Sequence, residues 1–357
     1  MREMTGSEVV RFAIIDALEC DEKTVLFGLG VEDPKGIFGT TLSLTEKFGL
    51  GRVFETPTAE SASSGIAIGM ALAGLKPTVT YQRVEFALLG FEQIVNQAAK
   101  WRYMTNGAAS CPVTYRLIIG KGWGQGPQHS QGLESVFGHF PGLKVFAPGS
   151  PESLYHTIRS CMVDEDPCVI LEHRWLHHVK VCRNVIGSLR VSTKSLAPAI
   201  KHTSGGLATV VSYGIGTMEA LRALKSLREH AGVEAELVEL TRMNPLDLTL
   251  VKESLTKTGR LIVFDHGWAQ YGVGSEVIAK VALSDIELRD KPVHLHIAPV
   301  PIPSSRFLAN DAYPQPADIA RKMLVWASID DEHLIGQVLG EIGLNTDVPS
   351  ESFKGPF

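Results

Sequence analysis

Residues 52–77 read RVFETPTAESASSGIAIGMALAGLKP, and their change of pattern decides the fold class. The stretch opens with the apolar pair Val53 and Phe54, passes through a turn that contains Thr and Pro, and continues as a run of small and apolar side chains. Small residues such as Gly65 and Gly69 let a helix lie close to its neighbours. A short apolar, β-branched segment at 76–81 follows. This order of strand, helix and strand predicts a parallel sheet.

The same alternation extends in both directions and predicts an α/β fold with two domains. Short apolar segments bounded by Gly, Pro or Asp predict strands at residues 24–29, 76–81, 113–119, 143–147, 167–172, 208–212, 233–239, 260–265 and 291–297. Apolar residues at helical spacing predict helices at residues 7–19, 61–75, 91–103, 217–230 and 275–283.

The chain of 357 residues exceeds the usual size of one domain, so we expect two. Periodicity weakens around residues 184–206 into Ser, Thr, Lys, Pro and Gly, which is typical of a linker. We therefore predict a first domain at 1–185, a linker at 186–206, a second domain at 207–330 and a peripheral helix and tail at 331–357.

Composition limits the classes of partner. The formal net charge is -5, from 34 basic and 39 acidic residues spread along the chain, so no basic stripe is available to follow a nucleic-acid backbone. The five cysteines form no CxxC pair, which argues against a disulfide framework and favours a reducing cytoplasm. No apolar run reaches the length of a membrane span. We expect no nucleic-acid or membrane partner.

Glu60 stands at the predicted helix start, where backbone amides are exposed. Alone, it could be an ordinary helix-start acid favoured by the helix dipole. Tyr81, Gln82 and Phe86 follow the next predicted strand and should lie at the carboxyl edge of the sheet, where ligands bind in parallel sheets. The alternative for Phe86 is a core aromatic residue.

A glycine-rich segment, GKGWGQGPQHSQ at residues 120–131, follows another predicted strand. It lacks the GK[ST] ending of a Walker loop and the spacing of a dinucleotide-binding fingerprint. His129 in this segment can donate or accept a proton near neutral pH and is predicted to open a helix. A surface loop is the alternative. No HExxH metal motif occurs, and we assign no side chain as a metal ligand.

Seven segments together resemble a known family, the beta subunits of the thiamine diphosphate-dependent decarboxylating component of 2-oxoacid dehydrogenase complexes. They are residues 52–77, FEQIVNQAAKWRYMTNG at 91–107, GPQHSQ at 126–131, HFPGLKVFAPGSP at 139–151, TRMNPLD at 241–247, KTGRLIVFDHGWAQYGVGSEV at 257–277 and APVPIP at 298–303. The resemblance implies a thiamine diphosphate-binding domain of the pyrimidine type and a second α/β domain like the C-terminal domain of transketolase.

The resemblance also implies an activity, the oxidative decarboxylation of a small 2-oxo acid with transfer of the acyl group to a lipoyl-type acceptor. Glu60 matches the glutamate that shares a proton with the aminopyrimidine ring of the cofactor. Tyr81, Gln82 and Phe86 match its surroundings, with Phe86 against the ring. His129 matches the histidine that serves the later steps.

Half of the site is implied to lie in another chain. In the family, a separate alpha subunit of an alpha2beta2 heterotetramer holds the diphosphate and its magnesium ion, and this sequence has no GDG motif for them. A lipoyl acyltransferase core is a further possible partner. Some relatives hold potassium near the residues matched by Cys161, Asp164 and Asp166.

The sequence departs from the family pattern at three positions. Leu29 stands where a glutamate is usual, and Arg83 and Glu85 place charges where neutral residues are more common. The substrate or acceptor is therefore not fixed as pyruvate and lipoamide. Two alternative functions also stay open. One is half of a split transketolase or a related ketol transferase, and the other is a catalytically idle scaffold subunit.

Overall fold

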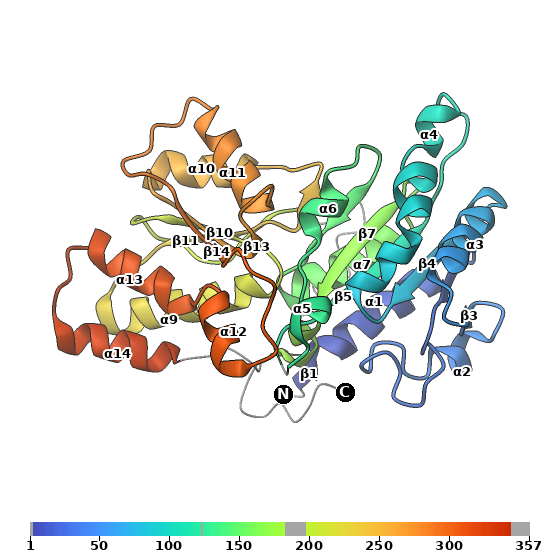
Figure 1. Ribbon diagram of the computed structural model, residues 1–357, viewed down its shortest axis with the longest axis horizontal. Helices are drawn as coiled ribbons and strands as arrows, with labels where there is room; N and C mark the ends of the chain where they lie inside the picture. The colour runs from blue at the N-terminus through green and yellow to red at the C-terminus, as the bar shows by residue number, and fades with distance from the viewer. Residues whose placement is uncertain (1–2, 123, 183–197, 344–357) are drawn as a thin grey trace.

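Two parallel sheets, one in each half of the chain, form the two domains of the molecule and confirm the predicted α/β class (Figure 1). The computed structural model describes residues 3–122, 124–182 and 198–343. The first half lies on one side in Figure 1 and the second half on the other. Among the described residues, no helix is long and apolar enough to cross a bilayer.

The first sheet has seven strands in the order β12-β6-β7-β5-β4-β2-β3, and all its neighbours are parallel except β12 and β6. Its strands are β2 Thr24–Phe27, β3 Val53–Phe54, β4 Lys76–Tyr81, β5 Thr114–Ile119, β6 Lys144–Phe146, β7 Cys168–His173 and β12 Arg242–Asn244. The last of these comes from the second half of the chain, so the two domains share a sheet edge.

Helices cover both faces of this sheet. The helical segments of the first half are α1 Gly6–Cys20, α2 Leu44–Phe48, α3 Glu60–Leu72, η1 Val84–Gly90, η2 Gln93–Ala98, α4 Trp101–Met104, α5 Gly126–His129, α6 Glu134–Gly138, α7 Pro151–Met162 and η3 Arg174–His178. Alternation along β5 divides the core, because Ile118 packs with α1 and α7 whereas Leu117 and Ile119 face α3 and η2. A separate two-stranded sheet joins β1 Glu3–Thr5 to β8 Lys180–Cys182.

The segment predicted as one helix at residues 91–103 differs from the expectation. It contains the π-helical η2 followed by the short α4. The amide of Ala99 bonds the carbonyl of Ile94 at 3.0 Å, five residues back, which widens the turn. The predicted buried face survives this change, since Ile94, Val95, Ala98 and Ala99 are all buried.

The second sheet has five strands in the order β14-β13-β10-β11-β9, of which only β9 is antiparallel to its neighbour. Its strands are β9 Ile200–Lys201, β10 Thr209–Ser212, β11 Glu236–Glu239, β13 Leu261–Trp268 and β14 Val293–Ile297. The surrounding helices are α9 Ile215–Ala231, α10 Thr249–Thr258, α11 Val273–Ala282, α12 Arg306–Ala312, α13 Pro316–Trp326 and α14 Glu332–Ile342.

One part of the interface between the domains is apolar. Val211 and Leu240 of the second half belong to one continuous buried cluster with Phe137 and Val145 of the first. This burial stabilises the arrangement of the two domains. It also places the carboxyl ends of β5 and β7 next to those of β10 and β13. A single cavity is lined by residues at or near the carboxyl ends of all four strands.

Part of the predicted domain division falls on residues that the structure does not describe. Of the predicted linker 186–206, residues 186–197 lie outside the described residues, and Ile200–Lys201 form β9. In the predicted tail 331–357, α14 places Val338 and Ile342 in the core of the second domain, while 344–357 lie outside the described residues. The boundaries themselves stay a prediction.

Candidate active site

Glu60 is the first residue of α3, at the carboxyl edge of the first sheet. Tyr81, the last residue of β4, donates its hydroxyl to the backbone carbonyl of Glu60 at 3.0 Å and lies 2.7 Å from Oγ of Ser64. Burial raises the pKa of the Tyr81 hydroxyl, so this group keeps its proton. Tyr81 therefore ties the first turn of α3 to the sheet and leaves the half-buried Glu60 side chain at the edge.

Gln82 makes a second brace at the same edge. Its side-chain amide donates to the carbonyl of Leu29 at 3.2 Å, in the loop after β2. Gly30 has a φ of +79°, and a Cβ atom there would lie 2.3 Å from the Gln82 amide nitrogen. The left-handed φ at this position favours glycine, and a side chain there would displace the Gln82 amide. Tyr81 and Gln82 both use their polar groups to hold the edge in place.

The segment η1 lies between the backbone of Glu60 and the ring of His129. At one end, Gly90 packs so close that a Cβ atom there would lie 3.0 Å from the carbonyl oxygen of Glu60. At the other end, the ring of Phe86 meets the ring of His129 edge to face, with centroids 6.1 Å apart and planes at 85°. Phe86 is half-buried, so it is not the simple core aromatic of the alternative interpretation. The structure therefore gathers Glu60, Phe86 and His129 along one short element.

The glycine-rich segment folds back on its own start. A Cβ atom on Gly120 would lie 2.2 Å from Oε1 of Gln125 and 2.7 Å from the carbonyl oxygen of His129. Only glycine fits such an approach. His129 ends the one-turn helix α5 and does not open a helix as predicted, because Pro127 and the left-handed Gly126 start the turn ahead of it. Trp123 lies outside the described residues.

Two charged residues of the segment after β4 hold the glycine-rich loop. Arg83 donates to Oε1 of Gln125 at 2.5 Å, and Oε1 of Glu85 contacts Nδ1 of His129. The Glu85 side chain is 10% exposed, whereas that of His129 is 37% exposed. His129 therefore rests on a buried carboxylate while part of its ring remains open to solvent.

A buried ion pair lies behind this loop, between the domains. The ammonium of Lys121 is 3.1 Å from Oε1 of Glu219 on α9, and Oε2 of Glu219 is 2.6 Å from Nε2 of His266 on β13. The rings of Trp175 and Tyr313 lie 4.8 and 4.4 Å from the same ammonium. Burial lowers the pKa of Lys121, which Glu219 partly offsets. Sequence reasoning missed this group, although Glu219 interrupts the apolar face of its helix beside Ala220 and Ala223.

A cavity of about 20 Å³, enough for a single water molecule, adjoins the ion pair. Ser130, the neighbour of His129, lines it, and its hydroxyl has no hydrogen-bond partner within the described part of the chain. Glu134 also lines it, and burial raises the pKa of this carboxyl to about 8. Polar groups thus extend from the loop of His129 into the interface between the domains.

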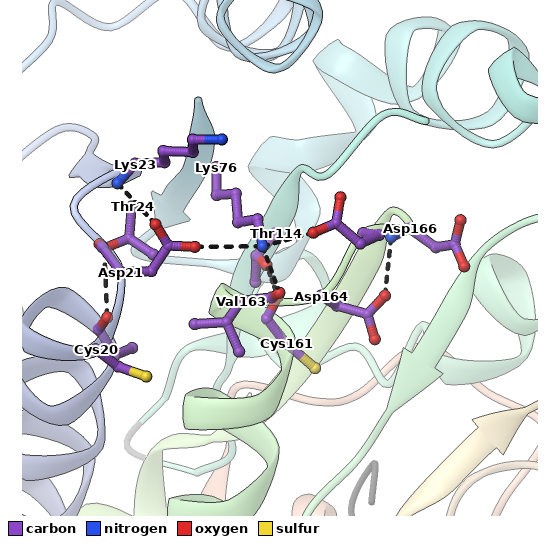
Figure 2. A network of polar contacts seen from close by, with 12 residues as sticks. Cys20, Asp21, Lys23, Thr24, Lys76, Thr114, Cys161, Val163, Asp164 and Asp166 are labelled. Atoms are coloured by element: carbon purple, nitrogen blue, oxygen red, sulfur yellow. Dashed lines mark hydrogen bonds and ion pairs between the residues drawn. The ribbon is translucent and has the colours of Figure 1, made fainter. Parts of the chain in front are cut away.

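Cys161, near which a monovalent cation is expected, is the penultimate residue of α7 and lies beside Thr114 at the amino-terminal start of β5 (Figure 2). Glu60, by contrast, lies at the carboxyl edge of the same sheet. The carbonyl oxygen of Cys161 accepts the hydroxyl of Thr114 at 2.8 Å. The carbonyl of Val163 accepts the ammonium of Lys76 at 2.9 Å. Two backbone oxygens of this turn are therefore already bonded to groups of the chain.

The carboxylates of the same turn are paired with lysine. The ammonium of Lys144 is 2.7 Å from Asp164 and 3.1 Å from Asp166. Burial would raise the pKa of Asp166, but Arg102 and Lys144 outweigh it and lower the pKa. In residues 3–122, 124–182 and 198–343, no group of three or more His, Cys, Asp or Glu side chains is arranged to hold a metal. Potassium at this turn stays a prediction.

Comparison with known proteins identifies the two halves and the whole chain. Residues 2–178 match the family described as transketolase, pyrimidine binding domain, and residues 199–319 match transketolase, C-terminal domain. The mitochondrial pyruvate dehydrogenase E1 component subunit beta of Bos taurus is 32% identical over 322 residues, which are 89% of each chain. The chain belongs to the family of pyruvate dehydrogenase E1 beta-like subunits.

Other relatives agree with this assignment. The mitochondrial subunit beta-1 of pyruvate dehydrogenase E1 from Arabidopsis thaliana is 33% identical over 90% of this E1 beta-like chain and 88% of its own length. The corresponding subunit beta of Rhizobium meliloti is 32% identical over 89% and 69%. A solved structure, described as a split gene transketolase in an inactive beta4 tetramer, shares the fold with a TM-score of 0.72 at 20% identity, over 91% of this chain and 99% of that one. The predicted resemblance is confirmed.

Proposed function

We propose that this E1 beta-like chain is the beta subunit of a 2-oxo acid dehydrogenase that uses thiamine diphosphate, and that Glu60 is its first catalytic residue. The observation that carries the proposal is the fixed carboxylate at the start of α3, with its backbone held by Tyr81 and with Phe86 and His129 along the adjoining η1. A site that binds a planar, protonatable heterocycle needs a carboxyl group to exchange its proton and an aromatic ring to pack against its face. The residues therefore fit the aminopyrimidine part of the cofactor.

Each side chain has a proposed task. Glu60 would exchange a proton with the ring nitrogen of the aminopyrimidine, and Phe86 would orient the ring. Tyr81 and Gln82 would complete the cofactor site by holding the chain at Glu60 and Leu29 in place. Bound thiamine diphosphate supplies the electron sink for decarboxylation of a small 2-oxo acid. His129 would hold or deliver a proton during transfer of the acyl group to a lipoyl-type acceptor.

The other half of the site would come from an alpha subunit in an alpha2beta2 heterotetramer, which would hold the diphosphate and magnesium. The absence of a GDG motif from the sequence supports this proposal, as do exposed apolar side chains on the helix that Glu60 starts and on η1. The two elements pack together, and these exposed side chains are Ile66, Leu72, Leu88 and Leu89. We further propose a cytoplasmic location, because the cysteines of the described residues are free. Docking to a lipoyl acyltransferase core is an additional possible contact.

The test is to purify the chain alone and together with an alpha subunit, and to measure 2-oxo acid-dependent reduction of an artificial electron acceptor. We expect activity only with both subunits, and a loss of about a hundredfold or more in Glu60→Gln, because the amide cannot exchange the proton. The exposed Glu253→Gln is a matched control with the same loss of charge. Activity of the lone chain would contradict the shared site. Full activity of Glu60→Gln would favour an idle scaffold, and activity with ketose phosphates alone would favour a ketol transferase.

A further inference from the structure

Glu85 and His129 form a pair whose geometry is asymmetric. Oε1 of Glu85 contacts Nδ1 of His129, while Nε2 of the same ring forms no hydrogen bond to the described residues. The carboxylate is nine-tenths buried and the imidazole is more than one-third exposed. The buried acid therefore lies behind the ring and leaves the opposite nitrogen toward the open side.

The chemistry of the contact selects one form of the ring. An ionised carboxylate only accepts hydrogen bonds, so Nδ1 of His129 must carry the proton that joins the two groups. In the neutral imidazole, Nε2 is then the acceptor. The contact thus fixes the tautomer and the direction of the ring, as a carboxylate does for a histidine in catalytic and metal sites.

A purely structural role does not account for the environment of Glu85. Its second oxygen, Oε2, is buried without a hydrogen-bond partner among the described residues. A buried acceptor left unpaired lowers the stability of the fold. An acid selected only for stability would satisfy both oxygens or lie at the surface, where an exposed ion pair contributes little. Glu85 satisfies only the oxygen that faces His129.

The surrounding contacts keep the pair in register. Arg83, two residues before Glu85, donates to Gln125, four residues before His129. The two bonds hold the glycine-rich loop at two points, and the ring of Phe86 supports His129 edge to face at 6.1 Å. Arg83 and Glu85 are also the two charges that depart from the family pattern in this stretch, so this chain has its own means of holding His129.

We propose that Glu85 is the positioning residue of His129, which it holds as the Nδ1-protonated tautomer with Nε2 directed to the open side of the site. The functional part of this inference rests on the proposed role of His129 in acyl transfer. The geometric part does not, because the tautomer can be measured without any activity.

The first experiment measures the tautomer. Histidine labelled with ¹⁵N is incorporated into the chain in complex with its alpha subunit, and magic-angle-spinning spectra are recorded for the wild type, Glu85→Gln and Glu85→Leu. The resonances of His129 are those that vanish in His129→Gln. We expect the wild type to show Nδ1 protonated, and Glu85→Leu to show a mixture of tautomers or protonated Nε2. An unchanged ring signal in Glu85→Leu would overturn the inference.

The second experiment separates the two halves of the reaction. We expect Glu85→Leu to keep 2-oxo acid-dependent dye reduction within about twofold, and to lose about tenfold to a hundredfold in kcat for acyl transfer to a lipoyl acceptor, with KM unchanged. Glu85→Gln, whose amide oxygen can still accept from Nδ1, should lose less. Glu253→Gln is the control. Should Glu85→Leu fail to fold, Glu85→Ala, which also removes the acceptor, replaces it in both experiments. Normal acyl transfer despite an altered tautomer would overturn the positioning role, whereas a wild type without dye reduction would refute the proposed function and leave the tautomer result standing.

Discussion

Replacing Glu172 by glutamine tests the most deeply buried charges of the first domain. Glu172, on β7, accepts two hydrogen bonds of 2.7 Å from the guanidinium of Arg116 on β5, and its Oε1 also contacts His177. The side chains of Arg116 and Glu172 are 1% and 0% exposed. Burial would raise the pKa of Glu172, but Arg116 and His177 outweigh it and hold the pKa at about 2.

The pKa of Glu172 sets the size and sign of the effect. Because the folded pKa of about 2 lies below the ordinary value of 4.5, the charged form stabilises the fold above pH 4.5 and loses this contribution as the pH falls toward 2. The difference between the two values corresponds to about 3 kcal/mol. Glutamine would leave the charge of Arg116 buried without a counter-charge, so we expect a loss of about 3–5 kcal/mol at neutral pH.

Urea unfolding at about pH 7, 5 and 4 measures the prediction. The difference in unfolding free energy between wild type and Glu172→Gln should be constant from pH 7 to about 5 and smaller by about 1 kcal/mol at pH 4. It shrinks because the Glu172 carboxylate of the wild type takes up a proton on unfolding, whereas the amide of the variant cannot. Glu253→Gln, at an exposed site, is the control. A loss below about 1 kcal/mol at pH 7, or a gap that widens with acid, would refute the reasoning.

Two further changes test contacts between elements. Lys121→Met should lower the unfolding free energy by about 3–5 kcal/mol, because it leaves buried Glu219 without its lysine. The control is Lys180→Met, at an exposed lysine. Equal melting temperatures for the two variants would contradict the prediction. Tyr81→Phe should lower the unfolding free energy by about 1–2 kcal/mol, because it removes the hydrogen bond to the backbone of Glu60. It should also reduce kcat for dye reduction with little change in KM. An unchanged kcat would show that this hydrogen bond does not position the carboxylate.

Local patterns in the sequence predict the layers of the fold well. The strand predicted at residues 76–81 agrees with β4 Lys76–Tyr81, because short apolar and β-branched runs favour buried parallel strands. The start of α3 at Glu60 likewise follows from the turn and the small-residue run before and after it. The strand β12 was not predicted. It has only three residues, of which Arg242 and Asn244 are polar and partly exposed, so the sequence shows no strand periodicity there.

The candidate site is predictable only where its residues follow neighbouring strands. Phe86 and His129 come after β4 and β5, which are adjacent and parallel, so their meeting follows from sheet topology. The contact of Glu85 with His129 and that of Lys121 with Glu219 depend on loop conformation and on how the two domains dock. Neither contact is encoded in a local sequence pattern. Lys121 and Glu219 are 98 positions apart, so no motif could predict that they meet.

The strand β12 affects the order in which the chain folds during synthesis. It pairs antiparallel with β6, and residues 242–244 leave the ribosome long after the rest of the first sheet has been made. Until then, the free side of β6 presents unpaired backbone groups that another nascent chain could capture. Completion of the N-terminal half thus waits for translation of the C-terminal half, and a gene cut within 186–206 would yield an N-terminal fragment prone to self-association.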